Sequence, residues 1–207
     1  MLVWNDDEKD AFAELINVGM GLAASALSSM LGREFFLSVP SVEFISRQEM
    51  GQRFSRDVGN DIVGVRQAFQ GAVEGNIALL FAKDSSFNLV GELVGDEVPL
   101  EDLPDIEQEA IAEVGNIVLN ACLAAIADAL HLKIPTGLPL FVRGIPVDLE
   151  DNDDEAEIDP LFLLSQVKFD LKDKDLSGFV VLVMTLPSAI RFKRELQNLI
   201  SSYRAAE

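Results

Sequence analysis

The sequence predicts an α+β protein built from two copies of one unit, each reading helix, about three strands, helix. A short polar pattern occurs twice: Glu14 and Asn17 in the first copy match Glu113 and Asn116 in the second, 99 positions later. Each copy is followed by segments of β-type alternation and then by a helical segment. Hydrophobic residues make up 49% of the 207, which is ample for one continuous core.

The first helix should begin near Asn5, because Asn5 and Glu8 have the spacing of a capping box, and it should end before Gly32. At about 100° per residue, its polar and apolar side chains fall on opposite sides. The polar stripe, expected to face solvent, holds Asp10, Glu14, Asn17, Gly21 and Ser28. The apolar side, expected to be buried, holds Phe12, Ile16, Ala23, Ala26, Leu27 and Met30.

The second long helix should run from about Ile106 to Leu130, after Pro104 and a second capping pattern at Asp105 and Gln108. Its outward stripe holds Glu109, Glu113, Asn116 and Asn120. Its buried side holds Ile111, Val114, Val118, Ala121 and Ala125. Beside each Glu–Asn pair the outward surface is built of small residues, Gly21 and Ala24 in one copy and Ala124 and Ala127 in the other. Such a surface lets another protein approach closely.

Three β-rich segments should follow each long helix, and a shorter helix should close each half. The expected strands are 34–45, 61–70, 73–82, 139–147, 161–171 and 178–185, and the closing helices are 85–94 and 188–202. Gln70-Gly71 suggests a hairpin turn. Aligning Gly75–Phe81 with Gly178–Met184 gives repeats of about 5–97 and 104–203 within a single domain, 1–207. Two such halves can pack the motif-bearing helices on β-sheet around a pseudo-twofold axis.

Charge and composition exclude several functions. With 35 acidic and 16 basic residues the net charge is −19, which disfavours nucleic acid and anionic membrane surfaces as partners. The densest acidic run, 148–159, should be a solvated loop, and it lacks the glycine and ligand spacing of an EF-hand. No apolar run reaches the roughly 20 residues of a membrane span, and the N-terminus lacks the basic start of a signal peptide. We therefore expect a cytoplasmic protein.

The single cysteine and single histidine limit the available chemistry. Cys122 and His131 cannot form an internal disulfide or a Cys/His zinc cluster. Cys122 lies among small apolar residues of the second long helix, which is typical of a buried structural thiol. His131, near the end of that helix, is expected to be structural as well.

The two Asn residues are the most informative polar side chains. Asn is a poor helix former, so its occurrence in the middle of two helices at one offset favours a role for the carboxamide. That group cannot act as a base, but it can hold a water molecule in line with an electrophile. A carboxylate one turn earlier could orient the water or grip a cation on a partner. Neither copy supplies a phosphate cradle, metal cage or nucleophile, so these would have to come from elsewhere.

This pattern resembles the signature of the CheC, CheX and FliY chemotaxis phosphatases: Asp or Ser, three residues, Glu, two residues, Asn, twenty-two residues, Pro. Its positions are filled by Asp10, Glu14, Asn17 and Pro40 in the first copy and by Glu109, Glu113, Asn116 and Pro139 in the second. Glu109 stands where the family usually has Asp or Ser. CheX relatives have a single site, and FliY proteins carry an additional switch domain for which this chain has no room. The chain therefore looks most like CheC.

The resemblance implies hydrolysis of the aspartyl phosphate of CheY or a related response regulator by in-line attack of water. It gives Asn17 and Asn116 the role of orienting the water, and it pairs Glu14 and Glu113 with the regulator's active-site lysine. Mg²⁺ would be bound by the phosphorylated regulator, with no cofactor on this chain. The duplication supplies internally what a dimer would provide, which is compatible with a monomer.

The sequence leaves two other functional hypotheses open. In the first, the chain is a non-catalytic adaptor that uses the same helices to bind a receiver domain or the receptor deamidase CheD. In the second, it is an acidic scaffold whose Glu–Asn pairs are merely solvated. Measuring binding and phosphate release on the same sample separates all three.

Overall fold

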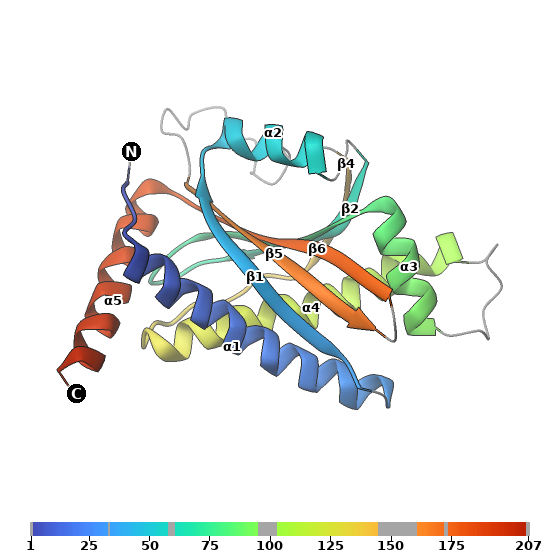
Figure 1. The fold of residues 1–207 in the computed structure, drawn as a ribbon, viewed down its shortest axis with the longest axis horizontal. Coiled ribbons are helices and arrows are strands. Elements are labelled where there is room, and N and C mark those ends of the chain that lie inside the picture. Colours follow the sequence, from blue (N-terminus) through green and yellow to red (C-terminus); the bar gives the residue numbers. More distant parts are fainter. Residues whose placement is uncertain are drawn as a thin grey trace.

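The structure, a computed structural model, describes residues 2–32, 34–57, 61–94, 103–144, 161–171 and 174–205. One antiparallel sheet has helices on both faces (Figure 1). The helices are α1 (Asp6–Leu31), α2 (Arg47–Asp57), α3 (Lys83–Val94), α4 (Leu103–Ala129) and α5 (Leu186–Arg204). α1 and α4 lie side by side in opposite directions on one face, α3 and α5 lie toward the ends, and α2 covers the other face. The predicted α+β class is confirmed.

The sheet interleaves strands from the two halves of the chain. Its order is β1-β5-β6-β3-β2-β4, and every pairing is antiparallel. The strands are β1 (Phe36–Ile45), β2 (Ile62–Phe69), β3 (Gly75–Ala82), β4 (Leu140–Gly144), β5 (Leu161–Leu171) and β6 (Lys174–Met184). The first strand of each half lies at an edge and pairs with the second strand of the other half. The order therefore reads alike from both edges.

The register at the centre of the sheet has the same symmetry. Ala78 of β3 lies opposite Val181 of β6, the residue with which the sequence alignment matches it. On either side of this pair, Gly75 lies opposite Met184 and Phe81 lies opposite Gly178. The alignment matches Gly75 with Gly178 and Phe81 with Met184, so exchanging the two halves converts each flanking pair into the other. The division into repeats 5–97 and 104–203 stays a prediction.

Most expected elements lie close to their predicted bounds. β6 begins four residues earlier than expected, and β4 occupies residues 140–144 of the segment predicted as strand. The remaining residues of that segment, 145–147, and the acidic run 148–159 lie outside the described residues. The predicted hairpin joins β2 to β3. Its Gly71 has φ +111°, and a Cβ there would come within 2.7 Å of the Lys133 carbonyl oxygen, so the turn requires glycine.

Helix α2 was not predicted. Most of its residues are polar, and among its side chains that the structure describes only Met50 and Phe54, one turn apart, are fully buried. These two side chains form a second core with strand residues on the far face of the sheet, including Phe179. A capping box begins the helix: the Ser46 backbone N–H donates to Glu49, and the Glu49 N–H donates to the Ser46 hydroxyl. Hydrogen bonds from the Ser46 backbone and side chain lower the pKa of Glu49.

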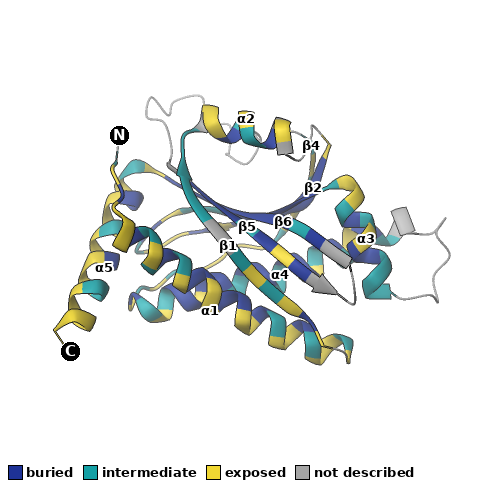
Figure 2. Cartoon of the chain, viewed as in Figure 1, coloured by how far each residue is buried: buried dark blue, intermediate teal, exposed yellow. Residues whose placement is uncertain are grey.

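The apolar side of α1 packs in the main core as predicted at Phe12, Ile16, Ala23 and Leu27, which are all buried. The prediction is wrong for Ala26 and Met30, which are exposed. Buried positions of α1 tend to follow steps of four residues, and each step turns about 40° beyond a full helical turn. The buried stripe therefore winds around the helix and leaves these two positions outside it. Figure 2 shows buried and exposed positions alternating along α1.

By length and hydropathy, α1 and residues Ile106–Ala129 of α4 would each suffice to cross a membrane, although neither is a continuous apolar run of about 20 residues. Such a composition is also found in core helices of soluble proteins. Here the apolar sides of both helices pack against the sheet and against each other in one core.

A buried carboxylate lies near the start of each long helix. Glu8 of α1 accepts hydrogen bonds from the Asn5 backbone and from Gln197, and it forms an ion pair with Lys193. Glu107 of α4, 99 positions later, accepts from the Ser86 hydroxyl at 2.5 Å and pairs with Arg143. Polar partners thus compensate both buried charges.

Candidate functional site

The first Glu–Asn pair lies on the outward side of α1. Glu14 and Asn17 are exposed, as are Asp10 and Gly21 on the same stripe. Their outward placement follows from the burial of Phe12 and its neighbours on the opposite side of the helix. Among the described residues, no hydrogen bond or ion pair engages the side chain of Glu14 or Asn17. Both groups are therefore available to a molecule in solution.

The second pair lies on α4 in a different environment. Glu113 and Glu109 are exposed, whereas Asn116 is partly buried. The Asn116 carboxamide oxygen accepts a hydrogen bond from Asn120 Nδ2 at 2.8 Å, and the same nitrogen donates to the Asn116 backbone carbonyl at 2.8 Å. Asn120 lies one turn further along the helix, where the first copy has Gly21. The two amides are thus held differently.

A strand residue extends this contact into the interior. Gln67 of β2, 2% exposed, donates from Nε2 to Asn120 Oδ1 at 3.2 Å and to the Gly137 carbonyl at 2.9 Å. The Thr136 hydroxyl donates to the same Asn120 oxygen at 3.4 Å. Sequence reasoning placed Asn120 on the outward stripe but missed Gln67. The sequence signal for Gln67 was a single amide on the face of β2 that also carries the buried residues Val65 and Phe69.

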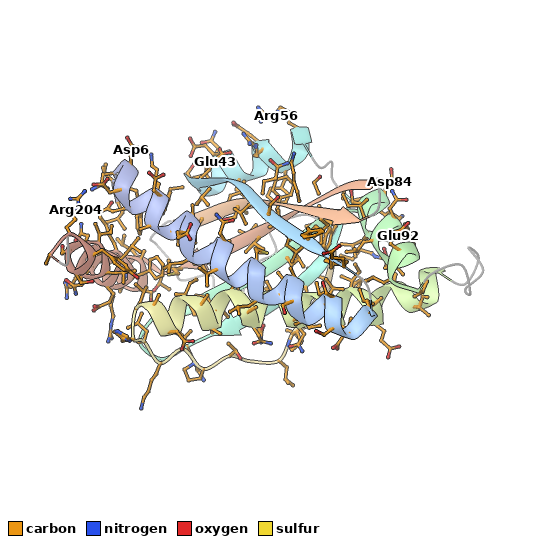
Figure 3. The ribbon with its side chains drawn as sticks, turned by 60° about the horizontal axis from the view of Figure 1, so that its bottom comes forward. Asp6, Glu43, Arg56, Asp84, Glu92 and Arg204 are labelled. Atoms are coloured by element: carbon orange, nitrogen blue, oxygen red, sulfur yellow. The ribbon has the colours of Figure 1, made fainter. Side chains whose placement is uncertain are left out.

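Two glycines allow the close packing that places the motif helices. A Cβ on Gly115 would lie 2.6 Å from side-chain atoms of Val65, so glycine lets α4 approach β2 directly beside Asn116. A Cβ on Gly19 would lie 2.6 Å from Cys122 Cα, which marks the close contact of α1 with α4. Because the helices run in opposite directions, Asn17 and Asn116 lie on opposite sides of the Gly19–Cys122 contact along the helix axes. Figure 3 shows α1 and α4 side by side in front of the sheet, with Asp6 and Arg204 labelled near the end where α1 meets α5.

The two motif prolines occupy different places in the sheet. Pro40 lies within β1, between Ser38 and Ser41, where the register against β5 shifts. Pro139 directly precedes β4. A proline has no backbone N–H for the ladder, so an irregularity and a strand start are positions that accommodate it. Equal spacing in the sequence thus does not give equal positions in the sheet.

The described residues offer few other reactive groups. They contain no group of three or more His, Cys, Asp or Glu side chains placed to hold a metal ion. Burial raises the pKa of the Cys122 thiol to about 12, so this cysteine is not a thiolate nucleophile. His131 is exposed in the turn after α4, with φ 53°. The two acid–amide pairs, with their exposed carboxylates, therefore remain the best candidates for function.

Comparison with known proteins shows what this chain is similar to. No protein-family model matches the sequence. CheY-P phosphatase CheC of Bacillus subtilis is 26% identical over 139 residues, 65% of this chain and 65% of that protein. Flagellar motor switch phosphatase FliY of the same organism is 26% identical over 168 residues, 80% of this chain and 42% of that protein. The chain thus spans less than two thirds of the length of either relative.

Solved structures of the family share the fold. FliY of Thermotoga maritima, 20% identical, superposes with a TM-score of 0.75 over 96% of this chain and all of that one. The chain is thus similar in sequence to CheC and FliY proteins and shares the fold of FliY. Another family structure, CheX of Borrelia burgdorferi in complex with CheY, BeF₃ and Mg²⁺, is 18% identical with a TM-score of 0.51 over 83% of this chain and 99% of that one.

The fold also extends to a flagellar protein outside these names. The FliM middle domain of H. pylori, 10% identical, has a TM-score of 0.69 over 93% of this chain and 99% of that one. Since likeness at this identity concerns the fold alone, function has to be argued from the acid–amide pairs.

Proposed function

We propose that this chain accelerates hydrolysis of the aspartyl phosphate on CheY or a related receiver domain. One observation carries the proposal: an exposed acid and an amide lie one helical turn apart on two helices, without a metal-ligand cluster among the described residues. The names of the relatives, CheY-P phosphatase and motor switch phosphatase, support the same reaction. Exposed apolar side chains beside Asn17, Val18 (48%) and Leu22 (54%), suit the docking of a protein substrate.

In the proposed mechanism, the Asn carboxamide holds one water molecule opposite the bond from phosphorus to the aspartyl oxygen. Water oxygen attacks phosphorus, the phosphorus–aspartyl oxygen bond breaks, and its electron pair stays on the aspartate as a carboxylate. The proton of the water leaves with the phosphate or to solvent. Glu14 or Glu113 pairs with the receiver's active-site lysine and so fixes the docked orientation. Mg²⁺ belongs to the phosphorylated receiver in this proposal.

The proposal places the protein in the cytoplasm as a monomer with two sites related by an internal duplication. The palindromic strand order and the self-matching pair Ala78–Val181 support a duplication, because exchanging two equivalent halves must leave both unchanged. A two-site monomer and a dimer are distinguished by sedimentation of the purified chain.

The alternative is a non-catalytic adaptor that binds a receiver domain or CheD through the same helices. The exposed apolar side chains of Val18 and Leu22 beside Asn17 favour keeping this candidate, because they suit the docking of a protein whether or not hydrolysis follows. An adaptor would bind the receiver and leave the lifetime of its phosphate unchanged.

The deciding experiment follows phosphate release from receiver domains of the same organism, phosphorylated with a small-molecule donor, with and without this chain. We expect faster release, and we expect Asn17→Ala combined with Asn116→Ala to abolish the acceleration. Asn88→Ala, which changes an exposed Asn on α3, is the matched control and should keep full activity. Unchanged release with retained binding would identify the adaptor instead.

A further inference from the structure

We infer that Asn120, backed by Gln67, is a positioning residue that fixes the orientation of the Asn116 carboxamide, and that the first site lacks this device. The inference rests on the proposed function for its kinetic consequence, but its structural basis is the hydrogen-bond geometry alone. It states which end of the Asn116 carboxamide contacts the water molecule and how strongly that orientation is held.

The direction of each amide follows from two backbone carbonyls, which can only accept hydrogen bonds. The Gly137 carbonyl requires the NH₂ end of Gln67, whose other proton then donates to Asn120 Oδ1. The Asn116 backbone carbonyl requires the NH₂ end of Asn120, whose other proton donates to Asn116 Oδ1. Both anchors give Asn120 the same orientation. The Asn116 amide therefore has one preferred orientation, with its oxygen toward Asn120.

The remaining capacity of Asn116 suits the proposed reaction. A carboxamide oxygen has two lone pairs, and Asn120 uses one of them. The second lone pair and the NH₂ group remain for a water molecule. A carboxamide that is already oriented loses less conformational freedom when the transition state forms.

The first site has none of these supports. Gly21 replaces Asn120 one turn after Asn17, and a Cβ there would meet nothing within 4 Å. The second strand of the other half, β5, has buried Ser165 where β2 has Gln67, in the register set by their central neighbours β6 and β3. The Asn17 carboxamide is consequently free to rotate. We expect the Asn116 site to have the higher turnover per site.

The test uses Asn17→Ala as the parent, so that only the second site turns over. Adding Asn120→Ala should lower kcat for phosphate release on the order of tenfold and leave the affinity for a beryllofluoride-bound receiver unchanged. Asn120→Asp should do the same, since it keeps an acceptor for Gln67 and loses both donors. Folding should survive because Gln67 keeps its bond to Gly137. A kcat within twofold of the parent, or an equal loss of affinity, would overturn the inference.

The converse experiment adds the missing residue to the first site. In an Asn116→Ala parent, Gly21→Asn should raise kcat severalfold, whereas Gly21→Ala, which favours the helix more strongly but adds no amide, should not. Equal kcat for both variants would count against the inference.

Nuclear magnetic resonance separates failure of this inference from failure of the proposed function. The Asn116 side-chain NH₂ signals should report a more rigid group than those of Asn17, and Asn120→Ala should remove the difference without any receiver present. If the parent protein does not accelerate phosphate release, the proposed function fails while this measurement still decides whether Asn120 orients Asn116. Equal mobility of the two amides in the unmodified protein would refute the orientation itself.

Discussion

Gly19 of α1 lies so close to Cys122 of α4 that an added Cβ would come within 2.6 Å of the Cys122 Cα. Backbone atoms cannot yield as a flexible side chain can, so Gly19→Ala should push the motif helices apart. We expect it to lower the free energy of unfolding by about 1–3 kcal/mol, as measured by urea titration. Gly21→Ala, in open space two residues on, should instead stabilise by up to about 1 kcal/mol. The idea fails if the two variants have the same stability.

The pair of Glu107 and Arg143 should respond unequally to loss of either partner. Glu107 is fully buried, whereas the Arg143 side chain is 51% exposed. Arg143→Met leaves a buried carboxylate with only the Ser86 hydroxyl, and we expect a loss of about 1–3 kcal/mol after allowance for solvent screening. Glu107→Gln removes the buried charge and leaves a solvated guanidinium, so its cost should be smaller. Thermal unfolding at pH 7 would contradict this if Glu107→Gln were the more damaging change.

Glu8 should contribute a pH-dependent part of the stability. Burial raises the pKa of Glu8, but hydrogen bonds from the Asn5 backbone and Gln197 and the charge of Lys193 outweigh it, so the pKa lies below the usual 4.5. A lowered pKa means that the folded state binds the proton less well, so the contribution is present above pH 4.5 and is lost as the pH falls through the folded value. The urea midpoints of the wild type and Glu8→Gln should therefore differ most near pH 7. A difference that widens below pH 4 would contradict the prediction.

Cys122 should be chemically silent in the folded protein. Its thiol is fully buried, and burial raises its pKa to about 12, so almost none is thiolate at pH 8. We expect no reaction with a thiol-specific disulfide reagent in buffer and one equivalent of reaction in urea. Rapid labelling under native conditions would show that the contact between α1 and α4 opens readily.

Local signals predicted the long helices and most strands. The Asn5 and Glu8 capping box and the periodic apolar residues of α1 lie close together in the sequence, so local patterns were sufficient to predict this helix. Helix α2 gave only a weak signal, because two apolar side chains in a polar segment do not define a stripe. Its capping box at Ser46 and Glu49 was nevertheless present in the sequence.

The features that escaped prediction depend on contacts between distant parts of the chain. Gln67 meets Asn120 across 53 positions, and no periodicity within either element indicates such a contact. The pairing of each edge strand with the opposite half is equally non-local. The sequence placed the two acid–amide pairs on outward stripes, but it could not reveal that the two amides have different neighbours.

The exchange of edge strands also constrains how the protein is made. β1 leaves the ribosome early, yet its hydrogen-bonding neighbour β5 follows more than a hundred residues later. Until then β1 has no strand to pair with and can join another nascent chain instead. Folding is therefore expected to finish only after synthesis of the second half, slowly for a chain of this length, and to depend on chaperones or dilution for its yield.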